Sequence, residues 1–151
     1  MIIISHRGLV DGDDPTKENN PTAIAAALGE FFLVYIDLWM VEGKPFLGTD
    51  GPVYPMPEDF IHNPDVILCP RDRMAVNFVA IRDAHFVIPT TGDYTLTSYK
   101  WLWAKSSAAS IGRDCIIHLP EDYYEPTQLV DTRFTGVCTK YPRIYHEALN
   151  M

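Results

Sequence analysis

The sequence predicts an α/β fold in the form of a compact, helix-poor (β/α) barrel. Short apolar runs rich in β-branched and aromatic residues recur along the chain, and each has the length of a strand. Helical segments alternate with these runs in the first half, which is typical of a parallel sheet, whereas the second half leaves little room for helices. The 151 residues suit a single domain over 1–151, although a complete eight-fold barrel typically needs about 250. We therefore expect a barrel that lacks most helices of its second half.

Eight segments are predicted as strands because they are apolar, short and bounded by turn-forming residues. In chain order they are Ile2–Ser5, Leu33–Met40, Pro45–Gly48, Val66–Cys69, His85–Ile88, Tyr99–Trp103, Cys115–Leu119 and Gly136–Thr139. A first helix is expected between the first two strands. Asn20 is a good N-cap for it, Pro21 fits the first turn, and Gly29 can end it.

A second helix is expected from about Asp72 to Arg82. Met74, Phe78 and Ile81 recur there at helical spacing, so we predict that this stripe faces the core.

Composition and charge narrow the classes of function. The net charge is −8, from 20 acidic and 12 basic residues, so the surface repels nucleic-acid backbones and anionic lipids. No apolar run is long enough to span a membrane, and the N-terminus lacks a signal-peptide pattern, so we expect a cytoplasmic protein. Cys69, Cys115 and Cys138 each border an apolar run, which favours reduced, buried core thiols.

The first strand runs directly into Ser5-His6-Arg7-Gly8. In parallel α/β folds the functional residues lie at the carboxyl ends of strands, which is where His6 and Arg7 stand. Histidine is the usual acid or base near neutral pH, and the arginine fork matches a phosphate. This pair therefore indicates a phosphoester site, or alternatively a surface pair that closes a strand.

Asp37 is the second unusual residue, because aspartate is disfavoured inside a strand. Strand alternation places Tyr35, Asp37 and Trp39 on one face and the aliphatic residues of the segment on the other. If the polar face lines the barrel interior, a buried carboxylate needs an ion or several donors. Arg7 is the obvious partner, so a structural pair with Arg7 and a metal-binding role are both open.

Several motifs occur in a recognisable order. They are His6-Arg7-Gly8, Glu18-Asn19, Tyr35-Ile36-Asp37, Glu42-Gly43-Lys44-Pro45-Phe46, Thr49-Asp50, and the late segment GVCTKYP at 136–142. This order resembles the glycerophosphodiester phosphodiesterase family of the PLC-like phosphodiesterase superfamily, in a compact short form with a degenerate active site. The resemblance implies a TIM-barrel-like phosphodiesterase fold.

The resemblance also implies metal-dependent hydrolysis of phosphodiesters. Carried over residue by residue, His6 would be a catalytic acid or base, and Arg7 would act beside it and bind the substrate phosphate. Glu18, Asp37 and Asp50 would be the metal ligands, and the cation would be Mg²⁺ or Ca²⁺. The expected ligand is a small phosphodiester or another phosphate-containing molecule.

The chain departs from the family pattern at several expected polar positions. They are occupied here by Tyr35, Thr49, Cys69-Pro70, Ile88-Pro89 and Lys140. Tyrosine does not replace a carboxylate as a ligand for a hard cation, and threonine is no general acid near neutral pH. His118 ends a late strand and is a candidate replacement acid. The substitutions predict that hydrolysis is weak or lost.

Two other functions are therefore open beside catalysis. The chain could be a non-catalytic pseudoenzyme that binds a phosphate-containing metabolite or a protein partner. It could also be a homo-oligomeric scaffold, such as a homodimer, that covers the barrel surface left bare by missing helices. Trp101 and Trp103 share one face of their predicted strand with Tyr99, because residues two apart point to the same side. These rings either fill the barrel interior or line a substrate pocket.

Overall fold

The computed structural model describes residues 1–106, 114–130 and 134–150. The strands are β1 (Ile2–His6), β2 (Leu33–Val41), β3 (Lys44–Leu47), β4 (Tyr54–Pro55), β5 (Val66–Pro70), β6 (Tyr94–Leu96), β7 (Leu102–Lys105), β8 (Cys115–His118) and β9 (Gly136–Thr139). The helices are α1 (Pro21–Gly29), α2 (Asp59–His62), α3 (Arg73–Ala80) and α4 (Pro142–Leu149), with short 3₁₀ turns η2 (Pro120–Asp122) and η3 (Pro126–Leu129).

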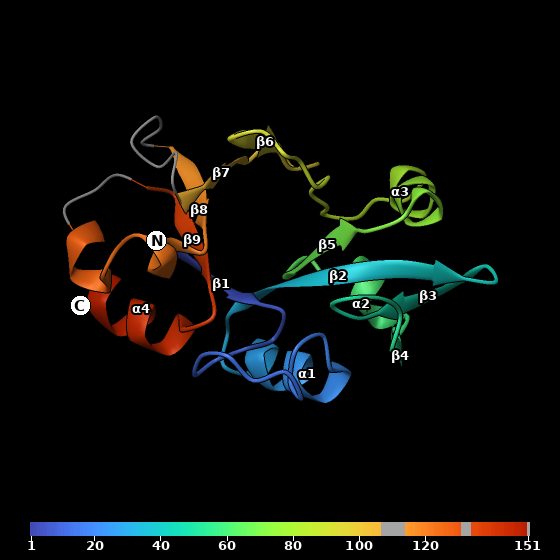
Figure 1. Ribbon diagram of the computed structural model, residues 1–151, viewed down its shortest axis with the longest axis horizontal. Helices are drawn as coiled ribbons and strands as arrows, with labels where there is room; N and C mark the ends of the chain where they lie inside the picture. Colours follow the sequence, from blue (N-terminus) through green and yellow to red (C-terminus); the bar gives the residue numbers. More distant parts are fainter. Residues whose placement is uncertain (107–113, 131–133, 151) are drawn as a thin grey trace.

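All these strands belong to one curled sheet (Figure 1). The order along it is β4-β3-β2-β1-β9-β8-β7-β6, and β5 pairs with β2. The central pairings, β2 with β1, β1 with β9, β9 with β8 and β8 with β7, are all parallel. Isolated bridges from Leu68 to Phe86 and from Val87 to Thr97 continue from β5 toward β6. The α/β class with few helices is confirmed, while a closed barrel stays a prediction.

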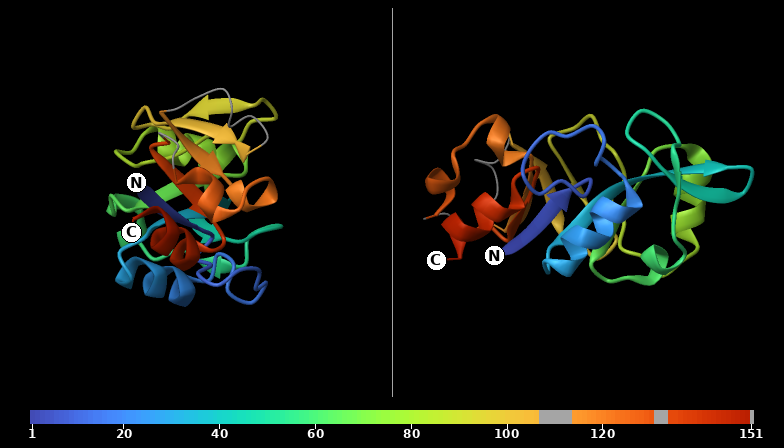
Figure 2. Two further views of the ribbon diagram at one scale, coloured as in Figure 1. Left: turned by 90° about the vertical axis from the view of Figure 1, so that its left-hand side faces the viewer. Right: turned by 90° about the horizontal axis from the view of Figure 1, so that it is seen from below.

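Helices cover the outer face of the curl, and its inner face is filled by side chains. Helices α1 and α3 pack on β2, α2 on β5, and α4 on β1 and β9 (Figures 1 and 2). The inner cluster of buried residues consists of Ile4, Tyr35, Ile67, Cys69, Val87, Trp103, Ile116 and Cys138. Alternation along β2 therefore works as predicted, because Val34, Ile36 and Leu38 pack in a different cluster, against the helices.

Most predicted strands are present, and the differences lie between 85 and 105. Residues 85–88 form isolated bridges rather than a regular strand. The strand predicted over Tyr99–Trp103 begins later, at Leu102, because Lys100 has a left-handed backbone (φ 64°) in the turn after β6. This turn interrupts the alternation on which the common face of Tyr99, Trp101 and Trp103 depended.

The helix predicted from about Asp72 is α3, but the predicted core stripe is wrong for Met74 and Ile81, while Phe78 is partly buried and packs against the core. Met74 is 61% exposed and Ile81 is 73% exposed, whereas Ala75 and Val79 are completely buried. The segment carries two apolar stripes one residue apart. The stripe with the smaller side chains faces the sheet, where it lets the helix approach β2 and β5 closely.

The sequence prediction omitted α4, the last helix, which packs on the first strand and so brings the end of the chain close to its beginning. Pro142 occupies the first turn of α4, and Tyr145 is buried against the sheet. The termini lie side by side, with the Met1 amino group 3.5 Å from Asn150 Oδ1 (Figure 1). No helix in the described part of the chain has the length and apolar character needed to cross a membrane.

Candidate functional site

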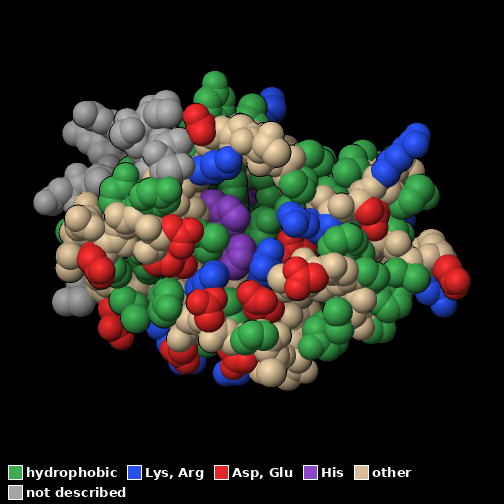
Figure 3. Space-filling view, viewed as in Figure 1, with side chains coloured by type: hydrophobic (Ala, Val, Ile, Leu, Met, Phe, Trp, Pro, Cys, Tyr) green, Lys and Arg blue, Asp and Glu red, His purple; other side chains and the backbone are tan. Residues whose placement is uncertain are grey.

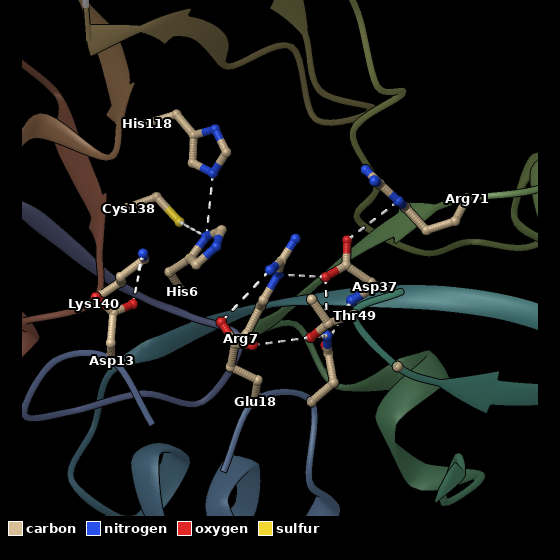
Figure 4. A network of polar contacts seen from close by, with 12 residues as sticks. His6, Arg7, Asp13, Glu18, Asp37, Thr49, Arg71, His118, Cys138 and Lys140 are labelled. Carbon is tan, nitrogen blue, oxygen red and sulfur yellow. Dashed lines mark hydrogen bonds and ion pairs between the residues drawn. The ribbon is translucent and has the colours of Figure 1, made fainter. Parts of the chain in front are cut away.

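Three side chains from neighbouring parallel strands meet inside the curl, at or near the carboxyl ends of these strands. They are His6 at the end of β1, Cys138 on β9 and His118 at the end of β8 (Figure 4). His118 Nε2 lies 3.2 Å from His6 Nδ1, and Cys138 Sγ lies 3.9 Å from the same nitrogen. His118, the candidate replacement acid, thus lies directly beside His6, and its role as an acid stays a prediction.

Aromatic rings from β2 and β7 pack against this group. The Tyr35 ring stacks on the His6 ring, with a centroid distance of 5.2 Å and an angle of 11° between the planes. The Trp103 ring stacks on Tyr35 in turn, with a centroid distance of 5.7 Å. His118 is tilted against both Tyr35 and Trp103. Tyrosine at the position where the family resemblance expects a glutamate therefore supplies a packing surface for the imidazole.

Burial controls the charge of the group. Desolvation lowers the pKa of His6 well below its ordinary value, with further lowering from the positive charges of His118, Arg7 and Lys140. Desolvation also lowers the pKa of His118 to about 4. Complete burial raises the pKa of the Cys138 thiol well above its ordinary value. Near neutral pH the group consists of two neutral imidazoles and a neutral thiol.

Asp37 is the centre of a second, adjacent network. Its Oδ2 lies 2.7 Å from Arg7 Nε and accepts a hydrogen bond from Asn19 Nδ2 at 2.9 Å, and its Oδ1 lies 3.6 Å from Arg71 Nε. The predicted pair with Arg7 is confirmed. Arg7 and Asn19 both have left-handed backbones, with φ of 60° and 57°; asparagine adopts this conformation readily, whereas it is uncommon for arginine and such residues often occur at functional sites.

The carboxylates expected to bind Mg²⁺ or Ca²⁺ have other partners. Asp37 is engaged by two arginines and an amide, while Glu18 lies 3.6 Å from Arg7 and accepts a hydrogen bond from Thr49 at 3.3 Å. Asp50 is exposed. In the described part of the chain these three carboxylates do not form a group with metal-binding spacing. Their binding of Mg²⁺ or Ca²⁺ therefore stays a prediction.

A different group does have metal-binding spacing. His6, His118 and Cys138 each offer one potential ligand atom, and these three atoms lie within 4.8 Å of one another. The three residues could therefore hold a metal ion. Sequence reasoning named both histidines but assigned Cys138 to the core, because its neighbours are apolar. Only the pairing of β9 between β1 and β8 brings the thiol to the histidines.

A cavity of about 140 Å³ lies beside the two networks, and its lining includes Tyr35, Arg71, Asp93, Lys105 and His118. Figure 3 shows histidine side chains in a hollow at the centre of this face, with lysine and arginine side chains around it. Lys105 Nζ donates a hydrogen bond to the Thr91 carbonyl at 3.0 Å, and among the described residues no carboxylate lies within ion-pair distance of it.

The two tryptophans expected to contact a substrate occupy different places. Trp103 is buried and contributes to the lining of this cavity. Trp101 lies outside it, with its ring edge-on to His85 and its side chain beside a separate cavity near Ile116.

Lys140, which replaces an expected acid, also stands at the mouth. Its Nζ lies 2.7 Å from Asp13 Oδ1, and its backbone amide donates a hydrogen bond to Glu121 at 2.8 Å.

Comparisons with known proteins identify no relative: no family model, no curated protein and no solved structure matches this chain. The geometry of the site therefore stands by itself as the basis for a functional proposal.

Proposed function

We propose that the chain binds a small phosphate ester, with the phosphate in the cavity beside His118. The observation that carries this proposal is the lining of the cavity, where Arg71 and Lys105 face a single acid, Asp93. In a chain with net charge −8, such a concentration of basic side chains around one hollow is unexpected without a local purpose. The arginine fork can bind two phosphate oxygens, and the lysine adds a flexible point charge.

The neighbouring network supports this assignment. Asp37 holds both Arg7 and Arg71, which limits the conformations that the two guanidinium groups can adopt. A site that is organised before binding loses less conformational entropy when the ligand arrives. The ring of Trp103 in the same lining offers a flat apolar surface for the organic part of an ester.

Calorimetric titration with inorganic phosphate and with glycerophosphocholine tests the proposal. We expect binding that weakens as salt is added, since part of the attraction is electrostatic. Lys105→Gln should reduce affinity at least about tenfold, because a charge-assisted contact contributes roughly 1.5–3 kcal/mol. Arg73→Gln is the matched control, since Arg73 is exposed and lies outside the cavity. An absence of binding, or an equal effect of both variants, contradicts the proposal.

Hydrolysis of a phosphodiester at the same mouth is a second candidate function, and the contact between His6 and His118 favours it. A neutral imidazole that faces the cavity can take a proton from an attacking water, and the imidazolium so formed can give that proton to the leaving oxygen, while the second imidazole lies 3.2 Å away. His118 lines the cavity, so its ring is within reach of a bound ester. The family resemblance through His6 and Arg7 points to the same chemistry.

Release of p-nitrophenol from a chromogenic phosphodiester tests this second candidate. We expect slow turnover in the wild type that His118→Gln lowers by about 10²-fold, the lower end of what a general acid or base contributes. His62→Gln is the control, because His62 is exposed and lies on α2. Turnover that is absent, or unaffected by His118→Gln, excludes hydrolysis and leaves the binding proposal to its own titration.

A further inference from the structure

The group formed by His6, His118 and Cys138 has a use that neither phosphate binding nor acid–base chemistry requires. Its ligand atoms come from three adjacent parallel strands, with β9 between β1 and β8, so their spacing is fixed by the sheet. In the pairing register, Cys138 lies opposite His118 on one side and opposite Ile4, two residues before His6, on the other. The side chains of residues two apart share a face, which explains why all three point into the curl.

The separations resemble those of a tetrahedral zinc centre. Zinc–nitrogen bonds of about 2.0–2.1 Å and zinc–sulfur bonds of about 2.3 Å place two nitrogens about 3.3 Å apart and a nitrogen and sulfur about 3.6 Å apart. The two imidazole nitrogens here lie 3.2 Å apart, and the sulfur lies 3.9 Å from His6 Nδ1. The remaining separation, between Cys138 and His118, is no more than 4.8 Å, so it needs to close by at most about 1.2 Å to reach the tetrahedral value.

The chemistry of the ligand atoms selects the cation. Two imidazoles and a thiol, without a carboxylate among them, suit a borderline metal such as Zn²⁺ and are poor ligands for Mg²⁺ or Ca²⁺. Cys138 is completely buried, forms no disulfide, and has His6 as its hydrogen-bonding neighbour. The apolar residues of the inner cluster surround it, and such a shell limits the access of water to a bound metal on that side.

We infer that His6, His118 and Cys138 form a Zn²⁺ site with its fourth position open to the cavity. His118 belongs both to the ligand group and to the lining of the cavity, so a water or an anion there can complete the tetrahedron. The positive charges of Arg7 and Lys140 repel a metal ion at this site. The thiolate formed on binding and the nearby carboxylates of Asp37 and Glu121 offset this repulsion. Three protein ligands with an open fourth position are the arrangement of catalytic rather than structural zinc.

Titration of chelator-treated protein with Co²⁺ tests the inference directly, because Co²⁺ takes tetrahedral zinc sites and reports its ligands. We expect one Co²⁺ per chain, visible absorption bands typical of tetrahedral cobalt, and near-ultraviolet charge transfer from a thiolate. Added Zn²⁺ should displace the cobalt and abolish these bands. Wild-type protein that binds Co²⁺ without the thiolate band, or fails to bind it, overturns the inference.

Variants identify the ligands and separate this inference from the phosphate proposal. Cys138→Ser should abolish the thiolate band and weaken Zn²⁺ binding more than about tenfold, since even groups behind the ligands change affinity by about 10–100-fold. Cys115→Ser is the matched control, because Cys115 is also a buried thiol but lies in the cluster on the outer face. His118→Gln provides a second ligand variant if Cys138→Ser does not fold, as judged by circular dichroism. Phosphate binding that persists in chelator while the cobalt bands are absent overturns the zinc inference alone.

Discussion

Asp37 shows how one buried charge organises the mouth of the site. Its side chain has no solvent exposure, and burial raises its pKa, while Arg7, Asn19 and Arg71 act in the opposite direction. Two guanidinium groups and an amide thus favour the ionised carboxylate against the effect of burial. Removing a charge from such a group leaves the remaining charges without compensation.

Replacing this carboxylate by an amide tests its role. We expect Asp37→Asn to lower the free energy of unfolding by about 2 kcal/mol, because Arg7 loses its closest anion and is only partly solvated. Urea denaturation followed by circular dichroism measures the change. Asp50→Asn is the control and should stay within about 0.5 kcal/mol, since Asp50 is exposed. Similar values for the two variants contradict a central role for Asp37.

His85 gives a pH dependence that can be assigned to one residue. It is buried, its Nε2 lies 2.9 Å from Thr97 Oγ1, and the Tyr99 ring stacks on it at 4.2 Å. Desolvation lowers its pKa from 6.5 to about 4. Between these values the unfolded chain binds the proton and the folded chain does not, so the contribution of His85 to stability is lost as the pH falls.

Comparing the wild type with His85→Gln isolates this contribution, because other groups cancel in the difference. The stability of the wild type relative to the variant should fall by about 2 kcal/mol between about pH 7 and about pH 4.5, since one pKa unit corresponds to about 1.4 kcal/mol. Urea midpoints measured across this range provide the test. A difference that is constant with pH shows that His85 titrates alike in the folded and unfolded chain.

At the scale of elements, the capping residues were easier to predict than the faces that pack. Asn20 caps α1 as predicted, with its side chain accepting a hydrogen bond from Thr22 N. Such a cap depends on neighbouring residues only, so the sequence shows it directly. The core stripe of α3 was predicted wrongly at Met74 and Ile81, because it depends on which side of the helix meets β2 and β5, and that contact is not local.

Asp72 has a structural role at the junction of α3 and β2. Its Oδ1 accepts a hydrogen bond from Ala75 N at 2.8 Å, and its Oδ2 accepts one from Met40 N at 3.1 Å. It therefore caps the helix that follows Arg71 and ties this helix to the strand that carries Asp37. Arg71, the residue before it, is also held by its own backbone hydrogen bond to Leu38 and its ion pair with Asp37, so we expect Asp72 to support the position of Arg71 and not to fix it alone.

We expect Asp72→Ala to cost about 2 kcal/mol, the upper end for a lost N-cap, because both hydrogen bonds disappear. It should also weaken phosphate binding to a smaller degree, since Arg71 keeps its ion pair with Asp37 but loses the support of its capped neighbour. Thermal unfolding and the phosphate titration measure the two effects. Asp83→Ala, at an exposed position just beyond α3, should change neither. Loss of stability with unchanged phosphate affinity would show that Asp72 does not position Arg71.

At the scale of the whole molecule, the site combines parts of the chain that the sequence does not place together. His6 and Arg7 could be located from the end of a strand, and Asp37 from the alternation of the next one. His118 and Cys138 lie 112 and 132 residues from His6 along the chain, and they reach it only through the strand order β1-β9-β8. Local patterns carry no information on that order, which explains why Cys138 was assigned to the core alone.

The sheet also divides the site into a central and a peripheral part. His6 and Cys138 stand on β1 and β9, each hydrogen-bonded on both sides, whereas Lys105 and Asp93 belong to the region of β6 and β7 at one end of the sheet. Opening free energies are highest for central strands and fall toward edges. The two walls of the cavity should therefore differ in stability before any ligand binds.

Amide hydrogen exchange tests this difference and its link to binding. Without ligand, we expect the slowest exchange at Ile4, which is fully buried on β1, and faster exchange at Thr95 on β6. Saturating inorganic phosphate should slow exchange mainly in 93–96 and at Lys105, because the ligand joins this wall to the stable centre through Arg71 and His118. Lys105→Gln should remove that local protection and leave β1 unchanged. Protection that rises equally in β1 and β6 would mean that phosphate stabilises the whole fold without closing this cavity.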